Sequence, residues 1–276
     1  MHTTENIKFE SFDFKKRLKG MLSVDFRRMF TMPLLYIIVG CCFVMPILIL
    51  VMTTMMDGTV SVNPQTGVET VMEGFDNVWQ IIGSVSSDAS SGSEAAMDMS
   101  ITSMCNINML YFFIAVLVCI FVSEDFRSGY AKNLFTVRAR KSEYVISKTL
   151  VCFVGGALMI LAFFLGSMLG GAISSLPFEM LGFNASELLA CVISKLLVVS
   201  VFVPIYLVIS VACKQKLWLS MIISFGVGMF LFMMIPMMTP LNSSIMNVIL
   251  CLAGGAIFSV GIGCISNIVL NKTGIL

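Results

Sequence analysis

Histidine and charged residues are scarce in this chain of 276 residues. Lys, Arg, Asp and Glu together make up 12% of the positions, against about 25% in an average soluble domain. His2, at the extreme N-terminus, is the only histidine, so Ser-His-Asp triads, Cys-His dyads and histidine-based zinc sites are excluded. The formal charge of +1 lacks the positive excess that marks nucleic-acid-binding proteins.

Metal-ligand and nucleotide motifs are missing as well. Eight of the nine cysteines lie inside apolar runs and are interpreted as small core residues, and Cys105 is a single thiol without an obvious partner. We therefore predict no metal site. The phosphate-binding pattern G-x-x-x-x-G-K-[ST] does not occur in the sequence, so any nucleotide hydrolysis must belong to another chain.

Apolar residues, in contrast, occupy 58% of the chain, and the mean hydropathy of +0.96 places the protein in a bilayer. Uncharged stretches cover residues 29–56, 99–123, 149–178, 196–213 and 217–271. Because about 20 residues cross the hydrocarbon core as a helix, the last stretch holds two spans, divided near Pro236 by turn-forming residues. The sequence thus predicts an all-α membrane protein with six transmembrane helices, at about 33–55, 105–123, 150–174, 188–212, 217–237 and 245–269.

The basic residues set the expected orientation. If both termini are cytoplasmic, 16 of the 17 Lys and Arg residues lie on the cytoplasmic side, as the positive-inside rule requires. We expect a multi-pass protein of the bacterial plasma membrane, with a cytoplasmic arm at 1–32, a transmembrane domain at 33–276, an outer loop at 57–104 and a cytoplasmic loop at 124–148. The first apolar run is too long for a signal peptide, so the N-terminal arm is expected to remain in the mature protein.

The N-terminal arm carries an amphipathic pattern. Apolar residues recur at steps of three and four, which predicts an interfacial helix with its apolar face in the headgroup boundary and its cations toward anionic lipid. Asp25 falls inside the apolar arc and is the exception to the pattern. The alternative is a solvated basic leader that only sets topology. The apolar face comprises Phe14, Leu18, Leu22 and Phe26, together with Met21 and Met29.

The cytoplasmic loop at 124–148 is longer than a turn between two membrane helices requires. Phe126, Tyr130, Leu134 and Phe135 form a helical apolar stripe beside charged positions. Such a stripe predicts a surface for a soluble partner, with a lipid-facing linker as the alternative.

The order of residues in this loop resembles the cytoplasmic loop of ABC-2 type transporter permeases. An acid at Glu124 is followed by Gly129, by a basic cluster that includes Arg140, and by Lys148 at the start of the next helix. The sequence departs from the family pattern at Tyr130, where Thr is commoner, and lacks a Pro before the basic cluster. The ATPase-coupling residues that the resemblance implies are Glu124, Asp125, Phe126, Gly129, Tyr130, Arg140 and Lys148.

The resemblance implies a type V exporter-like architecture with an N-terminal interfacial helix. It also implies a second permease subunit, in a homo- or heterodimer, and separate ATPase subunits that bind ATP and Mg, so that this chain is not itself an enzyme and binds no cofactor. The cytoplasmic loop would then dock in a groove of the ATPase and transmit its movement.

The membrane interior agrees with an ATP-driven partner. Gradient-driven carriers keep ionisable groups at depth, whereas Lys195 is the only such residue within a predicted span. We expect Lys195 to extend to the outer interface beside Glu187. Gly166 and Gly170 form a small-residue face that favours close helix packing.

The expected function is export of an amphipathic substrate, which could be an antimicrobial peptide, a drug or a lipid-like molecule. Met229, Met233 and Met237 are a candidate substrate path, because methionine adapts to varied apolar ligands, although methionine is also an ordinary apolar filler. The acidic outer loop could attract cationic peptides or could simply reflect the exclusion of basic residues. Other hypotheses are a membrane scaffold or sensor without transport activity and a gradient-driven carrier.

Overall fold

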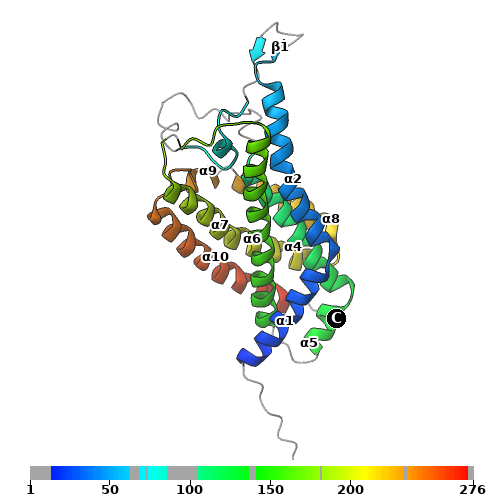
Figure 1. Cartoon of the computed structure of the whole chain (residues 1–276). Coiled ribbons are helices and arrows are strands. Elements are labelled where there is room, and N and C mark those ends of the chain that lie inside the picture. The colour runs from blue at the N-terminus through cyan, green and yellow to red at the C-terminus, as the bar shows by residue number, and fades with distance from the viewer. Residues whose placement is uncertain are drawn as a thin grey trace, which may run out of the picture.

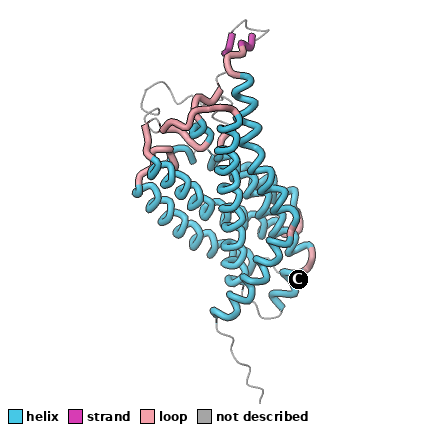
Figure 2. Tube along the Cα trace, viewed as in Figure 1, coloured by secondary structure: helices cyan, strands magenta, loops and turns pink. Residues whose placement is uncertain are grey.

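Long helices make up most of the structure (Figures 1 and 2). The computed structural model describes residues 14–62, 69–71, 74–85, 105–136, 141–180, 182–232 and 235–272. A two-stranded antiparallel hairpin, β1 (Val60–Val62) with β2 (Glu69–Val71), follows the second helix. The helices are α1 (Phe14–Thr31), α2 (Pro33–Met56), α4 (Leu110–Arg127), α5 (Tyr130–Thr136), α6 (Lys141–Ile173), α7 (Ala185–Cys213), α8 (Leu217–Phe232), α9 (Ile235–Met238) and α10 (Ile245–Lys272).

Five of the predicted spans correspond to helices that are long and apolar enough to cross a membrane. These are α2, the segment Ile107–Arg127 that contains α4, then α6, α7 and α10. The remaining predicted span, 217–237, corresponds to α8 of 16 residues and the four-residue α9. At 1.5 Å per residue, α8 is about 24 Å long and shorter than the roughly 30 Å hydrocarbon core. The sixth span therefore stays a prediction.

Helix α6 is much longer than the uncharged run from which it was predicted. It begins at Lys141 and has 33 residues, or about 50 Å of helix, against a core of about 30 Å. In Figure 1 it runs through the middle of the bundle, beside α2 on one side and α7 and α10 on the other. The first two turns of α6 therefore contain charged residues of the predicted loop at 124–148, and these turns lie beside α1 and α4.

The small-residue face of α6 packs against α2. A Cβ atom on Gly166 would overlap the carbonyl oxygen of Phe43, and one on Gly170 would come within 2.8 Å of the Ile47 Cα. Both glycines are fully buried among the described residues. The predicted close contact at Gly166 and Gly170 is confirmed, with α2 as the partner helix.

The outer loop folds onto the outer end of α6. A 3-10 helix forms at Val78–Ile81. Trp79 in this helix is 5% exposed, and its indole Nε1 donates to the Phe178 carbonyl at 3.2 Å. The backbone nitrogen of Val78 donates to the Pro177 carbonyl. This segment is therefore a packed cap on the protein, and the Ser-rich part of the loop at 86–93 lies outside the described residues.

Lys195 does not extend to the outer interface, so that expectation was wrong. Its side chain is 1% exposed, and Nζ donates to Asn108 Oδ1 at 3.0 Å and to Thr239 Oγ1 at 2.9 Å. Glu187, the expected neighbour, instead caps its own helix by accepting from the Asn184 backbone. The two neutral oxygens come from distant segments, and they satisfy the ammonium inside the bundle.

We predict that Gly166→Ala destabilises the protein by about 1–3 kcal/mol, because the added methyl group must displace the α2 backbone. The matched control is Gly254→Ala in α10, where a Cβ atom would meet no atom within 4 Å and the better helix propensity of alanine applies alone. Equilibrium unfolding in mixed detergent micelles measures both. Equal stability of the two variants would contradict the close α2–α6 contact.

Candidate functional site

A buried cluster of charges joins the second half of α1 to the C-terminal end of α4 and the N-terminal part of α6. The Lys148 ammonium from α6 lies 2.9 Å from the Asp25 carboxylate of α1 and 2.7 Å from the Asp125 carboxylate of α4. Each of these three side chains is 0% exposed. One cation thus holds two anions that belong to different helices.

Helix α6 supplies the hydrogen-bond donors that complete this cluster. The Tyr144 hydroxyl donates to Asp125 Oδ2 at 2.9 Å, and the Ser147 hydroxyl donates to Asp25 Oδ2 at 2.7 Å. Tyr144 and Lys148 are one helical turn apart, so they lie on the same face. The buried carboxylates therefore receive hydrogen bonds as well as charge, which burial of an ionic group requires.

Arg28 adds a second cation and balances the charge. Its Nη1 atom lies 2.6 Å from Asp125 Oδ1, and its guanidinium stacks 4.0 Å from the centroid of the Tyr130 ring. Burial lowers the pKa of Arg28, but Asp125, together with Tyr130 and Asp25, more than offsets this effect, so the net pKa is above the ordinary value. Burial also raises the pKa of the Tyr130 hydroxyl. Two anions and two cations face each other here, with a neutral phenol beside them.

Aromatic rings line the cluster on the remaining sides. The Lys148 ammonium lies 3.8 Å from the centroid of the Phe121 ring, within the range of a cation–π interaction. Phe135 of α5 packs edge-on against Tyr144 at 5.4 Å between centroids. The short helix α5 therefore contacts the cluster through Tyr130 and Phe135.

A further ion pair ties α1 to α6 near its start. Arg17 lies 3.0 Å from Glu143, whose side chain is 1% exposed. This pair and the Asp25–Lys148 pair are two turns apart on α1, so α1 is fixed to α6 along its length. In Figure 1, α1 accordingly lies against the lower end of α6.

The structure brings some predicted coupling residues together and separates others. Asp125 and Lys148 meet in the cluster, and Tyr130 stacks on Arg28. Phe126 is 9% exposed, so neither it nor Asp125 forms the exposed docking surface that the sequence suggested. The reason is that α4 continues to Arg127 and α6 begins at Lys141, so that α5 is the one separate helix in the described part of the loop.

Of the other three predicted coupling residues, the structure describes Glu124 and Gly129. Glu124 is exposed near the end of α4. Gly129 joins α4 to α5 with φ +73°, a conformation that glycine adopts without a side-chain clash. Arg140 lies outside the described residues.

The predicted interfacial face of α1 is only partly buried. Phe14 is 44% exposed, whereas Leu18, Leu22 and Phe26 are half-buried. The residues that α1 buries completely or nearly so are Met21, Asp25 and Met29. Asp25, the exception in the amphipathic pattern, is thus a residue through which α1 binds α6. The position of α1 at a membrane surface stays a prediction.

The candidate methionine path is not assembled in the described part of the chain. Met229 is 53% exposed on α8, while Met233 and the side chain of Met237 lie outside the described residues. No group of three or more His, Cys, Asp or Glu residues placed to hold a metal ion occurs among the residues described. All nine cysteines are described, and all are free thiols.

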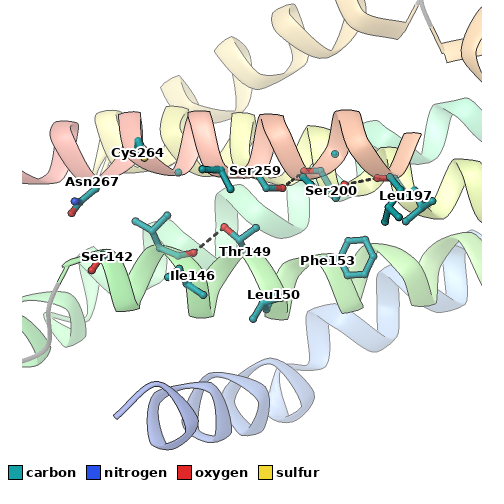
Figure 3. A pocket seen from close by; sticks show the side chains of 16 residues that line it. Ser142, Ile146, Thr149, Leu150, Phe153, Leu197, Ser200, Ser259, Cys264 and Asn267 are labelled. Carbon is teal, nitrogen blue, oxygen red and sulfur yellow. Dashed lines mark hydrogen bonds between the residues drawn. The ribbon is translucent and has the colours of Figure 1, made fainter. Parts of the chain in front are cut away.

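An apolar groove of about 550 Å³ lies between α6 and α10, with α7 behind it (Figure 3). Its three central hydroxyl groups are used internally: Thr149 donates to the Val145 carbonyl, Ser200 to Leu197, and Ser259 to Ser200. The surface that remains is formed by side chains such as Ile146, Leu150 and Phe153. The groove therefore suits the apolar part of a molecule.

Most contacts of the cluster could not be found from the sequence. The partners of Arg28, Glu143, Tyr144 and Ser147 gave no signal, because they are 19 to 126 positions away. The signal that was available is Asp25, an acid within an apolar helix face, since a buried carboxylate requires a partner.

Comparison with known proteins adds one match. A family model described as ABC-2 family transporter protein matches residues 22–231, well over half of the chain. No curated protein and no solved structure matches the chain. The matched range begins within α1 and includes every residue of the charged cluster except Arg17.

We predict that Lys148→Met lowers the free energy of unfolding by about 3–5 kcal/mol, because Asp25 is left without its cation and Asp125 keeps only Arg28. Lys132→Met is the matched control, since Lys132 is exposed on α5. Unfolding in mixed detergent micelles gives both values. The triple variant with Asp25→Asn and Asp125→Asn should recover part of the loss, and a triple variant less stable than Lys148→Met would contradict the pairing.

Proposed function

We propose that this chain, which belongs to the ABC-2 transporter family, is the permease subunit of a bacterial exporter that moves an amphipathic molecule out of the cell. ATP and Mg bind to separate ATPase subunits, and a second permease subunit, identical or related, completes the transporter. The family match and the membrane-spanning helices support the permease assignment. The absence of a phosphate loop from the sequence supports a separate ATPase.

The observation that carries the mechanism is the charged cluster beside α5. Helix α5 exposes Lys132, Asn133 and Thr136 while its buried side faces the rest of the protein. We propose that the ATPase contacts this exposed face. Because Phe135 packs against Tyr144 and Tyr130 against Arg28, a displacement of α5 is then transmitted to α6 and α1 without a flexible link.

Asp125 and Phe126 have a positioning role in this mechanism. They hold α4 against α6 and against the turn after α7, where Gln215 Nε2 donates to the Phe126 carbonyl at 3.4 Å. Lys148 has the same role from the opposite side. We therefore propose that the ATPase contacts the exposed side of α5 and not Asp125 and Phe126 at the start of the loop.

The substrate class rests on the groove between α6 and α10. A mostly apolar groove that lies among membrane helices suits a molecule with an apolar part and a polar end, such as an amphipathic peptide, a drug or a lipid-like molecule. The acidic outer loop, with no Lys or Arg between Asp57 and Asp98, favours release of a cationic substrate on that side.

A gradient-driven carrier has less support. Such carriers use a series of ionisable groups across the membrane. In the described part of the chain, the buried carboxylates Asp25, Asp125 and Glu143 all lie at the cytoplasmic end, and Lys195 contacts neutral oxygens. Transport by proteoliposomes that ran on a proton gradient without ATP would overturn the ATP-driven proposal.

We predict that Asn133→Arg with Thr136→Arg releases the ATPase, because both changes add bulk and charge to the proposed contact face. The tagged chain is purified from its native membrane, and the ATP hydrolysis that co-purifies is measured. At least a tenfold loss is expected. Gln80→Arg, an exposed position on the opposite side, is the control and should retain full activity; equal activity in all three proteins would contradict the docking on α5.

A further inference from the structure

A second feature adjoins the proposed ATPase contact and shares Lys132 with it. Two adjoining clefts, of about 770 and 510 Å³, lie between the end of α4, the start of α5 and the turn that joins α7 to α8. They share the lining residues Arg127, Gln215, Lys216 and Leu219. We refer to the joined clefts as the basic cleft, after four lining cations: Arg127, Lys132, Lys214 and Lys216.

The charge of this cleft is unbalanced. Glu124 is the single acid that lines it. Arg127, Lys132 and Lys216 have no carboxylate within 4.0 Å in the part of the chain that the structure describes. Elsewhere at the same end, Arg17, Arg28 and Lys148 each bind a carboxylate. In this respect Arg127, Lys132 and Lys216 differ from Arg17, Arg28 and Lys148.

The walls of the cleft are held in place by the chain itself. Gln215 from the α7–α8 turn donates to the Phe126 carbonyl of α4 at 3.4 Å, which bridges the two sides. The turns that form the walls have left-handed residues at Gly129, with φ +73°, and at Lys214, with φ 53°. The cations therefore face a preformed space.

The apolar border of the cleft indicates where it lies relative to the membrane. Trp218 lines the smaller cleft and is 80% exposed, and the adjacent Leu219 is 44% exposed. Both residues lie in the first turn of the apolar helix α8, next to the cations of the cleft. Exposed tryptophan next to cations is typical of the boundary between headgroups and acyl chains. An occupant must therefore be anionic at one end and apolar at the other.

We propose that the basic cleft binds an anionic phospholipid, with the phosphate among Arg127, Lys132, Lys214 and Lys216 and the acyl chains along Trp218 and α8. Basic pockets between membrane helices on the cytoplasmic side are suited to such headgroups. A soluble protein partner matches the charge but leaves Trp218 and Leu219 facing hydrocarbon. The proposal depends on the membrane location of the chain and not on ATP-driven export, so the two proposals fail independently.

The experiment measures quenching of Trp218 by brominated lipids. The full chain carrying Trp79→Phe, which leaves Trp218 as the sole tryptophan, is placed in phosphatidylcholine nanodiscs. A small fraction of brominated phosphatidylglycerol, or of brominated phosphatidylcholine with the same acyl chains, is then added. Stronger quenching by the anionic lipid is expected, because it collects beside Trp218.

Variants test whether the cations cause the preference. Lys214→Gln with Lys216→Gln should reduce the preference for phosphatidylglycerol at least about fivefold, the factor that one basic residue near an anionic surface contributes. Lys214→Arg with Lys216→Arg should retain it, which controls for folding. Lys16→Gln with Lys19→Gln removes two exposed cations from α1. This control should change the preference for phosphatidylglycerol less than twofold.

Two outcomes would overturn the proposal. Equal quenching by the two brominated lipids in the unmodified cleft would show that no anionic lipid collects there. If the Lys214→Gln, Lys216→Gln variant kept the lipid preference but lost the co-purifying ATP hydrolysis, the cations would serve a protein contact instead. Glycerol phosphate, added alone in solution, should not displace the lipid, because it lacks the acyl chains that Trp218 contacts.

Discussion

The Lys148 ammonium lies between the carboxylates of Asp25 and Asp125, and the arrangement of three helix ends depends on this contact. Burial of charge is costly unless each charge finds a partner and each remaining lone pair finds a donor. Here Arg28 and Tyr144 donate to Asp125, and Ser147 donates to Asp25. Since the donors and charges come from α1, α4 and α6, displacing one of these helices leaves buried charges unpaired.

This constraint makes the end of the bundle that holds the charged cluster a single unit. Helix α5 is attached to it by aromatic packing, and α6 continues from it through the whole bundle to the outer cap, where Gly171 lies against Val78. A 33-residue helix that packs on α2 through Gly166 and Gly170 connects the two ends with little freedom to bend independently. Movement at the inner end of α6 is therefore expected to reach the outer end.

Several features of this arrangement could be predicted from the sequence because they depend on local composition. Long uncharged runs predicted the five long membrane helices, and the spacing of Gly166 and Gly170 predicted a close helix contact. The charged cluster could not be predicted in the same way, since Asp25 and Lys148 are 123 positions apart. The same limit applies to Lys195, whose partners Asn108 and Thr239 come from other segments. The exposure of Asp125 and Phe126 was misjudged because α4 and α6 extend beyond the uncharged runs.

The central claim is that α1 and the α4–α5 turn move as one body with α6. Spin labels at Ser23 on α1 and Ser128 in the turn, both exposed, report the distance between these two elements in the assembled transporter by electron paramagnetic resonance. We expect one narrow distance distribution that is the same with and without ATP and that broadens in Lys148→Met. A distribution that shifts by several ångströms on ATP binding in the wild-type protein would contradict it.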